Sequence, residues 1–252
     1  MPAGISFANV SYSLPSRAGQ PARTLLRDNS LTLDPGTTTA ILGRSGSGKT
    51  TLLRMVNGLA HPTSGEIRIN GIPTHQQNPA TLRRSIGYVI QETGLFPHMT
   101  VERNAGLALE LAGQSIRQRA SRTSEVLALA GLDFADFRAR YPWQLSGGQR
   151  QRVGLARALA TDPAVLLMDE PFGALDPLTR AEMQTMLRDL LQRVGKTVLL
   201  VTHDLDEALY LAQRVVFLDH GEVVADIATA DVLHSANPHV RAYIAAVHRS
   251  SL

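Results

Sequence analysis

The chain has 252 residues, of which 44% are hydrophobic and 19% are charged, and its net charge is +3, so it is long enough for one large or two small globular domains. It contains no cysteine, which excludes disulfides and thiolate metal sites. The basic residues form no dense block, so nucleic acid is not an expected partner. The first residues show neither the basic nor the apolar run of a signal peptide, so we expect none. No apolar run approaches about 18 residues, so we also expect no membrane-spanning helix.

Short runs of alternating apolar and polar residues dominate the first ninety positions. This pattern predicts short strands, which favour an antiparallel sheet beside the buried strand Thr38–Leu42. Residues 13–22 contain two prolines and a glycine and are expected to form a loop. The other strands that we expect in this part are Ile5–Tyr12, Leu25–Leu33, Glu66–Ile69 and Ile86–Ile90.

A glycine-rich string, Gly43–Thr50, follows the strand at Thr38–Leu42 and precedes a helix-like run that ends near Val56. It fits the phosphate-binding P-loop pattern, in which backbone N–H groups converge on an anion at a helix N-terminus. Lys49 is expected to reach the β- and γ-phosphates, and the Thr50 hydroxyl to bind Mg²⁺. The alternative is a Gly/Ser-rich surface turn before an ordinary helix. The residues predicted to bind nucleotide are Gly43, Arg44, Ser45, Gly46, Ser47, Gly48, Lys49, Thr50 and Thr51.

Helical patterns occupy the middle of the chain, roughly residues 92–160, and predict an inserted helical subdomain. Its first helices are expected at Val101–Leu111 and Ser115–Leu129. A third helix is expected from Ser146 to near Ala160, with Ser146 as N-cap and Gln149 in the capping-box position. An ordinary capped helix explains Ser146, but not Gly147 and Gly148 in the first turn, because glycine there weakens the helix. We therefore predict a second anion site at this helix N-terminus.

Strands and helices alternate from residue 165 onward, which predicts a parallel sheet covered by helices and an α/β fold class. The expected strands are Val165–Met168, Thr197–Thr202 and Val215–Leu218, and the expected helices are Leu178–Val194, Leu205–Gln213 and about His239–Val247.

Two carboxylates, Asp169 and Glu170, follow the buried strand Val165–Met168. The carboxyl end of such a strand is where α/β sheets place their ligands. Behind a P-loop, Asp169 would help to hold Mg²⁺ and Glu170 would polarise an attacking water. A strand that simply ends in surface charges is the alternative.

Gly43–Thr50, Leu145–Gln149 and Val165–Glu170 resemble, in this order and spacing, the nucleotide-binding subunit of ATP-binding cassette (ABC) transporters. The resemblance covers nearly the whole chain. It implies a single nucleotide-binding domain over residues 1–252, with a P-loop core and antiparallel β subdomain in residues 1–91 and 161–252, and the helical insertion between them. It implies an ATPase that uses ATP and Mg²⁺.

The same resemblance assigns further residues. Gln91 is similar to the glutamine that senses Mg²⁺ and the attacking water, and His203 to the histidine that contacts the γ-phosphate. Asp176 lies in a string similar to the D-loop, and Tyr12 to the aromatic residue that stacks on adenine. Each has a structural alternative: a strand-end polar residue, a satisfied histidine, or a strand aromatic. The resemblance also assigns Ser146, Gly147, Gly148 and Gln149 to the γ-phosphate of a partner's nucleotide.

In this family the signature string of one subunit closes on the P-loop nucleotide of the other. The resemblance therefore implies an ATP-dependent homodimer on the cytoplasmic face of the cell membrane, two integral-membrane permease subunits and an extracytoplasmic substrate-binding protein. The segment Gln91–Glu102 would dock the permease, with Leu95 and Phe96 as apolar contacts, although Phe96 has a core position as its alternative.

The segments Ile86–Glu102, Tyr141–Gln149 and Met168–Asp176 are similar to importers of quaternary-ammonium osmoprotectants such as glycine betaine, carnitine and choline. Trp143 and Glu92 depart from the common pattern, and no tandem regulatory domain follows within the 252 residues, which puts ionic-strength sensing in doubt. Alternatives are an importer of another solute class, a soluble mechanochemical or regulatory ATPase, and a scaffold that binds nucleotide without hydrolysis. One P-loop, the absence of a heptad run and an intact Glu170 and His203 favour the importer.

Overall fold

The computed structural model describes residues 1–16, 22–91 and 93–249. The chain divides into two compact units. The first unit is Met1–Arg83 with Lys196–Leu252, and the second is Arg84–Gly195. Glu92 and residues 17–21 of the expected loop lie outside the described residues, and the first two positions of that loop belong to strand β1 (Ile5–Leu14) instead.

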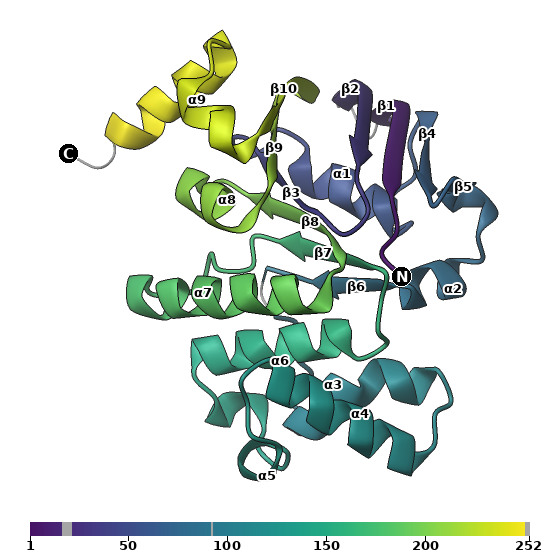
Figure 1. Ribbon diagram of the computed structural model, residues 1–252. Helices are drawn as coiled ribbons and strands as arrows, with labels where there is room; N and C mark the ends of the chain where they lie inside the picture. The colour runs from purple at the N-terminus through teal and green to yellow at the C-terminus, as the bar shows by residue number, and fades with distance from the viewer. Residues whose placement is uncertain (17–21, 92, 250–252) are drawn as a thin grey trace. The chain divides into compact units, whose positions relative to one another are not determined.

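An antiparallel sheet forms the N-terminal part of the first unit, with strand order β2-β1-β4-β5 (Figure 1). Its inner strand β1 alternates in burial at Ile5 and Phe7, as its apolar pattern predicts, and a register shift after Phe7 makes Val10 the next buried residue. The strands are β1 Ile5–Leu14, β2 Arg23–Leu33, β4 Ser64–Ile69 and β5 Ile72–Pro73.

The second sheet region of the first unit has the order β10-β9-β3-β8. β3 (Thr38–Leu42) runs parallel to both β8 (Thr197–Thr202) and β9 (Arg214–Asp219), whereas β10 (Glu222–Ala228) is antiparallel to β9. Every residue of β3 and β8 is buried. Leu42 is in register with Thr202 on one side and Phe217 on the other, so the segments that follow β3 and β8 begin at the same sheet edge.

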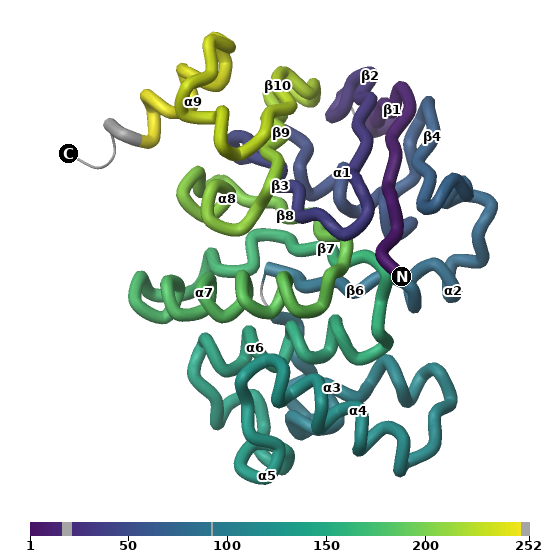
Figure 2. Tube along the Cα trace, in the orientation of Figure 1, coloured from purple at the N-terminus to yellow at the C-terminus, as the bar shows by residue number. Residues whose placement is uncertain are grey.

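The helical elements that begin in the first unit connect these strands. They are α1 Lys49–Val56, the short 3₁₀ turn η1 Thr74–Gln76, α2 Pro79–Arg84, α8 Leu205–Leu211, the 3₁₀ turn η3 Thr229–His234 and α9 Pro238–Arg249. Figure 2 traces α8 in yellow-green and α9 in yellow; α8 contacts β3 and β8, and α9 contacts β10.

The second unit contains the parallel strand pair β6 (Ile86–Val89) and β7 (Val165–Asp169) together with a group of helices. Helix α3 packs against α4 and α6, and α6 also contacts β6 and α7 (Figure 1). The helical elements of this unit are α3 Val101–Leu111, α4 Ile116–Leu129, α5 Phe134–Phe137, the 3₁₀ turn η2 Pro142–Gln144, α6 Gly147–Leu159 and α7 Pro177–Val194.

The predicted α/β class with an antiparallel sheet is confirmed. The expected end of the helix Leu205–Gln213 is wrong: α8 stops at Leu211. Gln213 instead bonds to β3, because its Oε1 accepts from Thr38 N at 2.7 Å and its own N–H donates to Thr38 O at 3.0 Å. The alternative that Phe96 is a core aromatic is also wrong, since its side chain is 41% exposed.

Candidate nucleotide-binding site

The P-loop of the first unit is shaped by two glycines that no other residue could replace without displacement. Gly48 is the N-cap of α1 at φ 105°, in the left-handed region that glycine tolerates. At Gly43, a Cβ atom would stand 2.3 Å from the carbonyl oxygen of Leu218. The loop between them is closed by a bond from Ser47 N to Arg44 O at 3.2 Å.

Lys49 is the first residue of α1 and is 5% exposed. Its ammonium group donates to the carbonyls of Gly43 at 2.8 Å and Arg44 at 3.0 Å, so the side chain folds back over the loop. Ser47 Oγ is buried and has no hydrogen-bond partner among the described residues. A buried hydroxyl beside a buried cation at a helix N-terminus is a donor set that fits a phosphate group.

The remaining loop residues are accessible or half-buried. Arg44, Ser45 and Gly46 are exposed, and Thr50 and Thr51 are half-buried in the first turn of α1. No acidic residue lies in this turn, so nothing there opposes an anion.

Tyr12 lies in β1, half-buried, opposite Leu26 of β2. Leu26 in turn packs against the P-loop, because a Cβ on Gly48 would stand 2.7 Å from its Cδ2. Tyr12 is thus separated from the start of α1 by one strand. Its adenine-stacking role stays a prediction.

His203 is exposed and follows β8 directly. Because Thr202 is in register with Leu42, His203 and Gly43 leave neighbouring strands at the same sheet edge. The fold therefore brings the predicted γ-phosphate histidine to the edge where the P-loop begins.

In the second unit, the two carboxylates at the end of β7 have different surroundings. Asp169 is 5% exposed, and its Oδ2 accepts from the Tyr88 hydroxyl at 3.4 Å. Glu170 is half-buried and has φ 45°, a conformation that is rare outside glycine and is found at functional sites. Gln91, which is exposed, donates from Nε2 to Glu170 Oε2 at 3.4 Å. The predicted water-activating pair is therefore brought together.

Ser146 caps α6 as predicted. Its Oγ accepts from Gln149 N at 3.2 Å, and Gln149 Oε1 accepts from Ser146 N at 2.9 Å. This capping box uses the N–H groups of Ser146 and Gln149, while those of Gly147 and Gly148 have no intrahelical acceptor.

The glycines of α6 also permit close packing against the start of α7. A Cβ on Gly148 would stand 2.7 Å from Thr179 Cγ2, whereas a Cβ on Gly147 would stand 3.4 Å from Leu175 Cδ2. Asp176 caps α7 by accepting from Thr179 N at 3.1 Å. Hydrogen bonds to the Thr179 side chain and backbone lower the pKa of the Asp176 carboxyl. The fold thus places the predicted signature string beside the predicted D-loop.

Three supporting residues were missed by sequence reasoning. Tyr88 holds Asp169, as described above. Arg157 of α6 donates to the carbonyls of Thr93 at 2.6 Å and Gly94 at 2.7 Å, and burial lowers the pKa of its guanidinium.

Asn104 is fully buried: its Oδ1 accepts from Phe96 N at 2.7 Å, and its Nδ2 donates to three carbonyls of the segment 96–100. Of these three residues, only Asn104 could have been noticed from the sequence, because a polar residue buried within a helix must find hydrogen-bond partners.

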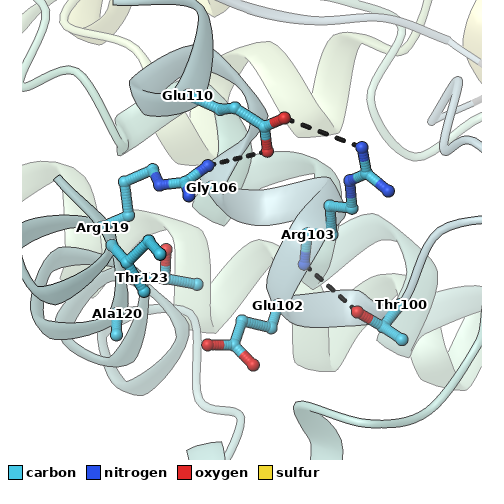
Figure 3. A pocket seen from close by; sticks show the side chains of 9 residues that line it. Thr100, Glu102, Arg103, Gly106, Glu110, Arg119, Ala120 and Thr123 are labelled. Carbon is cyan, nitrogen blue, oxygen red and sulfur yellow. Dashed lines mark hydrogen bonds and ion pairs between the residues drawn. The ribbon is translucent and has the colours of Figure 1, made fainter. Parts of the chain in front are cut away.

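A cavity of about 370 Å³ lies along α3 and α4 (Figure 3). Glu110 lies between Arg103 at 3.6 Å and Arg119 at 2.8 Å on this lining. None of the predicted nucleotide-binding residues lines this cavity. The Glu110 carboxylate instead forms ion pairs within α3 and with α4.

The described residues contain no group of three or more His, Asp or Glu side chains suited to a metal ion. Proteins usually hold Mg²⁺ through one or two carboxylates together with substrate phosphates. Thr50 in the first unit, and Gln91 and Asp169 in the second, each carry an oxygen of a kind that Mg²⁺ binds, and their joint role in holding this cation stays a prediction.

The family described as ABC transporter matches residues 26–173. The osmoprotectant import ATP-binding protein OsmV of Salmonella typhimurium is 43% identical over 241 residues, which covers 95% of this chain and 63% of the relative. The glycine betaine uptake system ATP-binding protein YehX of Escherichia coli is 49% identical over 81% of this chain and 66% of its own length. The taurine import ATP-binding protein TauB of Pseudomonas fluorescens is 48% identical over 81% of this chain and 75% of its own length. The chain thus spans slightly less than two thirds of the length of the first two relatives.

A solved structure described as the dimeric post-hydrolysis state of an ATP-binding cassette bound to ADP and Pi is 36% identical to this chain, with a TM-score of 0.79. The match covers 89% of this chain and 98% of that structure.

Proposed function

Since the chain belongs to the ABC transporter family, we propose that it is the ATP-binding and ATP-hydrolysing subunit of an importer for a small solute. The observation that carries this proposal is the pairing of Glu170 with Gln91 at the end of β7, in a chain that also holds a complete P-loop. A nucleotide-binding scaffold without hydrolysis would have no need for a strained carboxylate there.

Phosphate binding falls to the P-loop of the first unit. Its N–H groups and the Lys49 ammonium surround the β- and γ-phosphates, and an incoming phosphate replaces the carbonyls that Lys49 now contacts. Thr50, Gln91 and Asp169 would hold Mg²⁺, which supplies charge neutralisation on the phosphates when bound. The Tyr88 hydroxyl keeps the Asp169 carboxylate oriented.

Hydrolysis requires a water that is oriented toward the γ-phosphate. The Glu170 carboxylate accepts a hydrogen bond from that water, while the Gln91 amide fixes the rotamer of Glu170. His203 donates to the γ-phosphate from the end of β8. These roles use only positioning and charge, which is what phosphoryl transfer demands of a protein.

Each unit carries one helix N-terminus that the sequence predicts to bind phosphate, at α1 and at α6. We infer that two copies bind head to tail, so that Ser146, Gly147, Gly148 and Gln149 of one copy complete the site of the other. The dimeric cassette structure at 36% identity supports dimerisation, and the head-to-tail arrangement is our proposal.

The names of the relatives, which are import ATP-binding proteins, support importer partners for this chain. The dimer would bind two integral-membrane permease subunits at the cytoplasmic face of the membrane, with Leu95 and Phe96 as contacts, and an extracytoplasmic binding protein would deliver the solute. Phe96 is exposed and packs edge to face with His98 at 5.9 Å, an accessible apolar contact of the kind such docking needs. Among the residues that the structure describes, no helix has both the length and the apolar character to cross a membrane.

The names of OsmV and YehX support an osmoprotectant of the quaternary-ammonium class as the solute. The similarity to TauB supports a second candidate, an aminosulfonate such as taurine. Both proposals concern the assembled importer, because an ATPase subunit does not contact the solute.

Uptake of labelled solutes by cells that carry the whole transporter tests both proposals. The cells express this subunit either intact, as Glu170→Gln, or as Glu222→Gln, an exposed carboxylate whose loss serves as control. We expect betaine and choline uptake with the intact subunit and the control, and none with Glu170→Gln. Uptake of taurine alone would move the solute to the aminosulfonate class. Equal uptake by the Glu170 variant would contradict the ATPase assignment.

A further inference from the structure

Helix α9 of the first unit is anchored at its start on the sheet. Asn237 caps it, since its Oδ1 accepts from His239 N at 2.9 Å, while its Nδ2 donates to Val224 O of β10 at 3.0 Å. His239 Nδ1 lies 3.7 Å from Asp219 Oδ2 at the end of β9, and Val240 is fully buried. The first turn of α9 is therefore fixed relative to β9 and β10.

Tyr243 lies one turn further along α9 and is half-buried. Its ring packs edge to face against Phe217 of β9, with centroids 5.7 Å apart. Phe217 is in register with Leu42, the last residue before the P-loop. A cavity of about 130 Å³ lined by Gly43, Arg44 and Tyr243, among others, confirms that α9 reaches this sheet edge.

The hydroxyl of Tyr243 donates to the carbonyl oxygen of His203 at 2.6 Å. The same short segment is held from its other side, because Asp204 N donates to Thr202 Oγ1 at 3.0 Å. Asp204 in turn caps α8 by accepting from Glu207 N at 3.1 Å. The backbone of His203, which is otherwise an exposed loop residue, is thus fixed between β8, α8 and α9.

We propose that Tyr243 is a positioning residue for ATP hydrolysis, which fixes the His203 backbone so that its imidazole is directed at the γ-phosphate. The inference rests on the proposed function and extends it, since it makes α9, a helix outside the nucleotide-binding motifs, a determinant of turnover. The histidine side chain has only two rotatable bonds between its backbone and its planar ring. A shift of the His203 backbone therefore displaces the ring nitrogen that would donate to the γ-phosphate.

The first test is the Tyr243→Phe variant, which keeps the ring contact with Phe217 and removes only the hydroxyl. We expect kcat for ATP to fall about fivefold, as for the loss of one neutral hydrogen bond, with KM unchanged. Tyr210→Phe, a change at a 38% exposed tyrosine of α8, is the matched control and should retain full activity. In a His203→Ala background, Tyr243→Phe should have no further effect on kcat, because the two residues act as one unit.

The second test does not depend on turnover. Hydrogen exchange of the peptide that spans residues 201–207 should be faster in Tyr243→Phe than in the parent chain, with exchange in β3 unchanged. Unchanged exchange in that peptide would overturn the proposal, as would a full fivefold effect in the His203→Ala background. A parent chain that hydrolyses no ATP would count against the proposed function. The hydrogen-exchange measurement would then still decide whether Tyr243 fixes the His203 backbone.

Discussion

Glu170 illustrates how a single residue can serve chemistry against the preference of its own backbone. Its φ of 45° costs about 1–2 kcal/mol for a residue with a Cβ, yet this turn aims the carboxylate at the partner amide of Gln91. A glycine at this position would relieve the strain and remove the carboxylate together, whereas a glutamine would remove only the carboxylate. Comparing the two variants therefore separates the strain from the function.

We expect Glu170→Gly and Glu170→Gln both to bind ATP and to hydrolyse it at least about 100-fold more slowly than the parent, because each lacks the group that orients water. The free energy of unfolding of the Gly variant should be about 1 kcal/mol higher than that of the Gln variant, because glycine adopts the left-handed φ at position 170 without the cost that a Cβ imposes. ATP binding by calorimetry, steady-state hydrolysis and urea unfolding measure the three quantities. A Gln variant as stable as the Gly variant would show that Glu170 is unstrained.

At the scale of elements, the contact between the starts of α6 and α7 explains why the signature string needs its second glycine. Gly148 faces Thr179, whose Cγ2 would stand 2.7 Å from a new Cβ. Gly147 faces the flexible end of Leu175 at 3.4 Å, a contact that can relax. The two neighbouring glycines therefore differ in tolerance.

Gly148→Ala should lower the free energy of unfolding by about 1–3 kcal/mol through overpacking, and hydrolysis should fall with it, whereas Gly147→Ala should change stability by less than about 1 kcal/mol. Adding Thr179→Ser to Gly148→Ala removes the opposing methyl group and should restore most of the loss. Urea unfolding of the four chains provides the measurement. Failure of the serine to restore stability would place the cause elsewhere than in this contact.

Contiguous motifs could be read from the sequence because their chemistry lies within a few residues: the P-loop Gly43–Thr50, the cap at Ser146 and the acids after β7. The role of Thr179 could not, because it depends on packing between segments 31 residues apart in sequence. The end of α8 was misjudged for the same reason, since Gln213 bonds to β3 rather than continuing the helix. The roles of Tyr12, Gln91, Asp176 and His203 stay predictions, although the fold places each at an end or edge of its element that is compatible with them.

For the whole molecule, the P-loop and the signature string belong to different units of the chain. Trp143 is the only tryptophan, is 66% exposed and stacks on Tyr141 at 4.5 Å, three residues before the α6 cap. It therefore reports on whatever approaches the start of α6.

We expect Glu170→Gln to become a dimer in ATP and Mg²⁺ and to remain a monomer in ADP, because slow hydrolysis preserves the nucleotide that joins the two copies. Trp143 fluorescence should change on the same ATP titration, since dimerisation buries the region around α6. Sedimentation and fluorescence measured in parallel check the prediction, with Lys49→Ala as the control that lacks the phosphate-binding ammonium. A monomer at saturating ATP would contradict the head-to-tail dimer.

The burial of Lys49 has a chemical consequence for labelling. The chain has only two lysines, Lys49 and Lys196, and the former is 5% exposed with its amine turned onto the loop carbonyls. An acylating reagent should therefore modify the half-buried Lys196 of the folded chain faster than Lys49, which should react only when the loop opens. Mass spectrometry of the Lys49 peptide over time would follow the opening of the P-loop, and would give its rate where acylation is faster than reclosing. Bound ATP should slow the labelling of Lys49 without affecting Lys196.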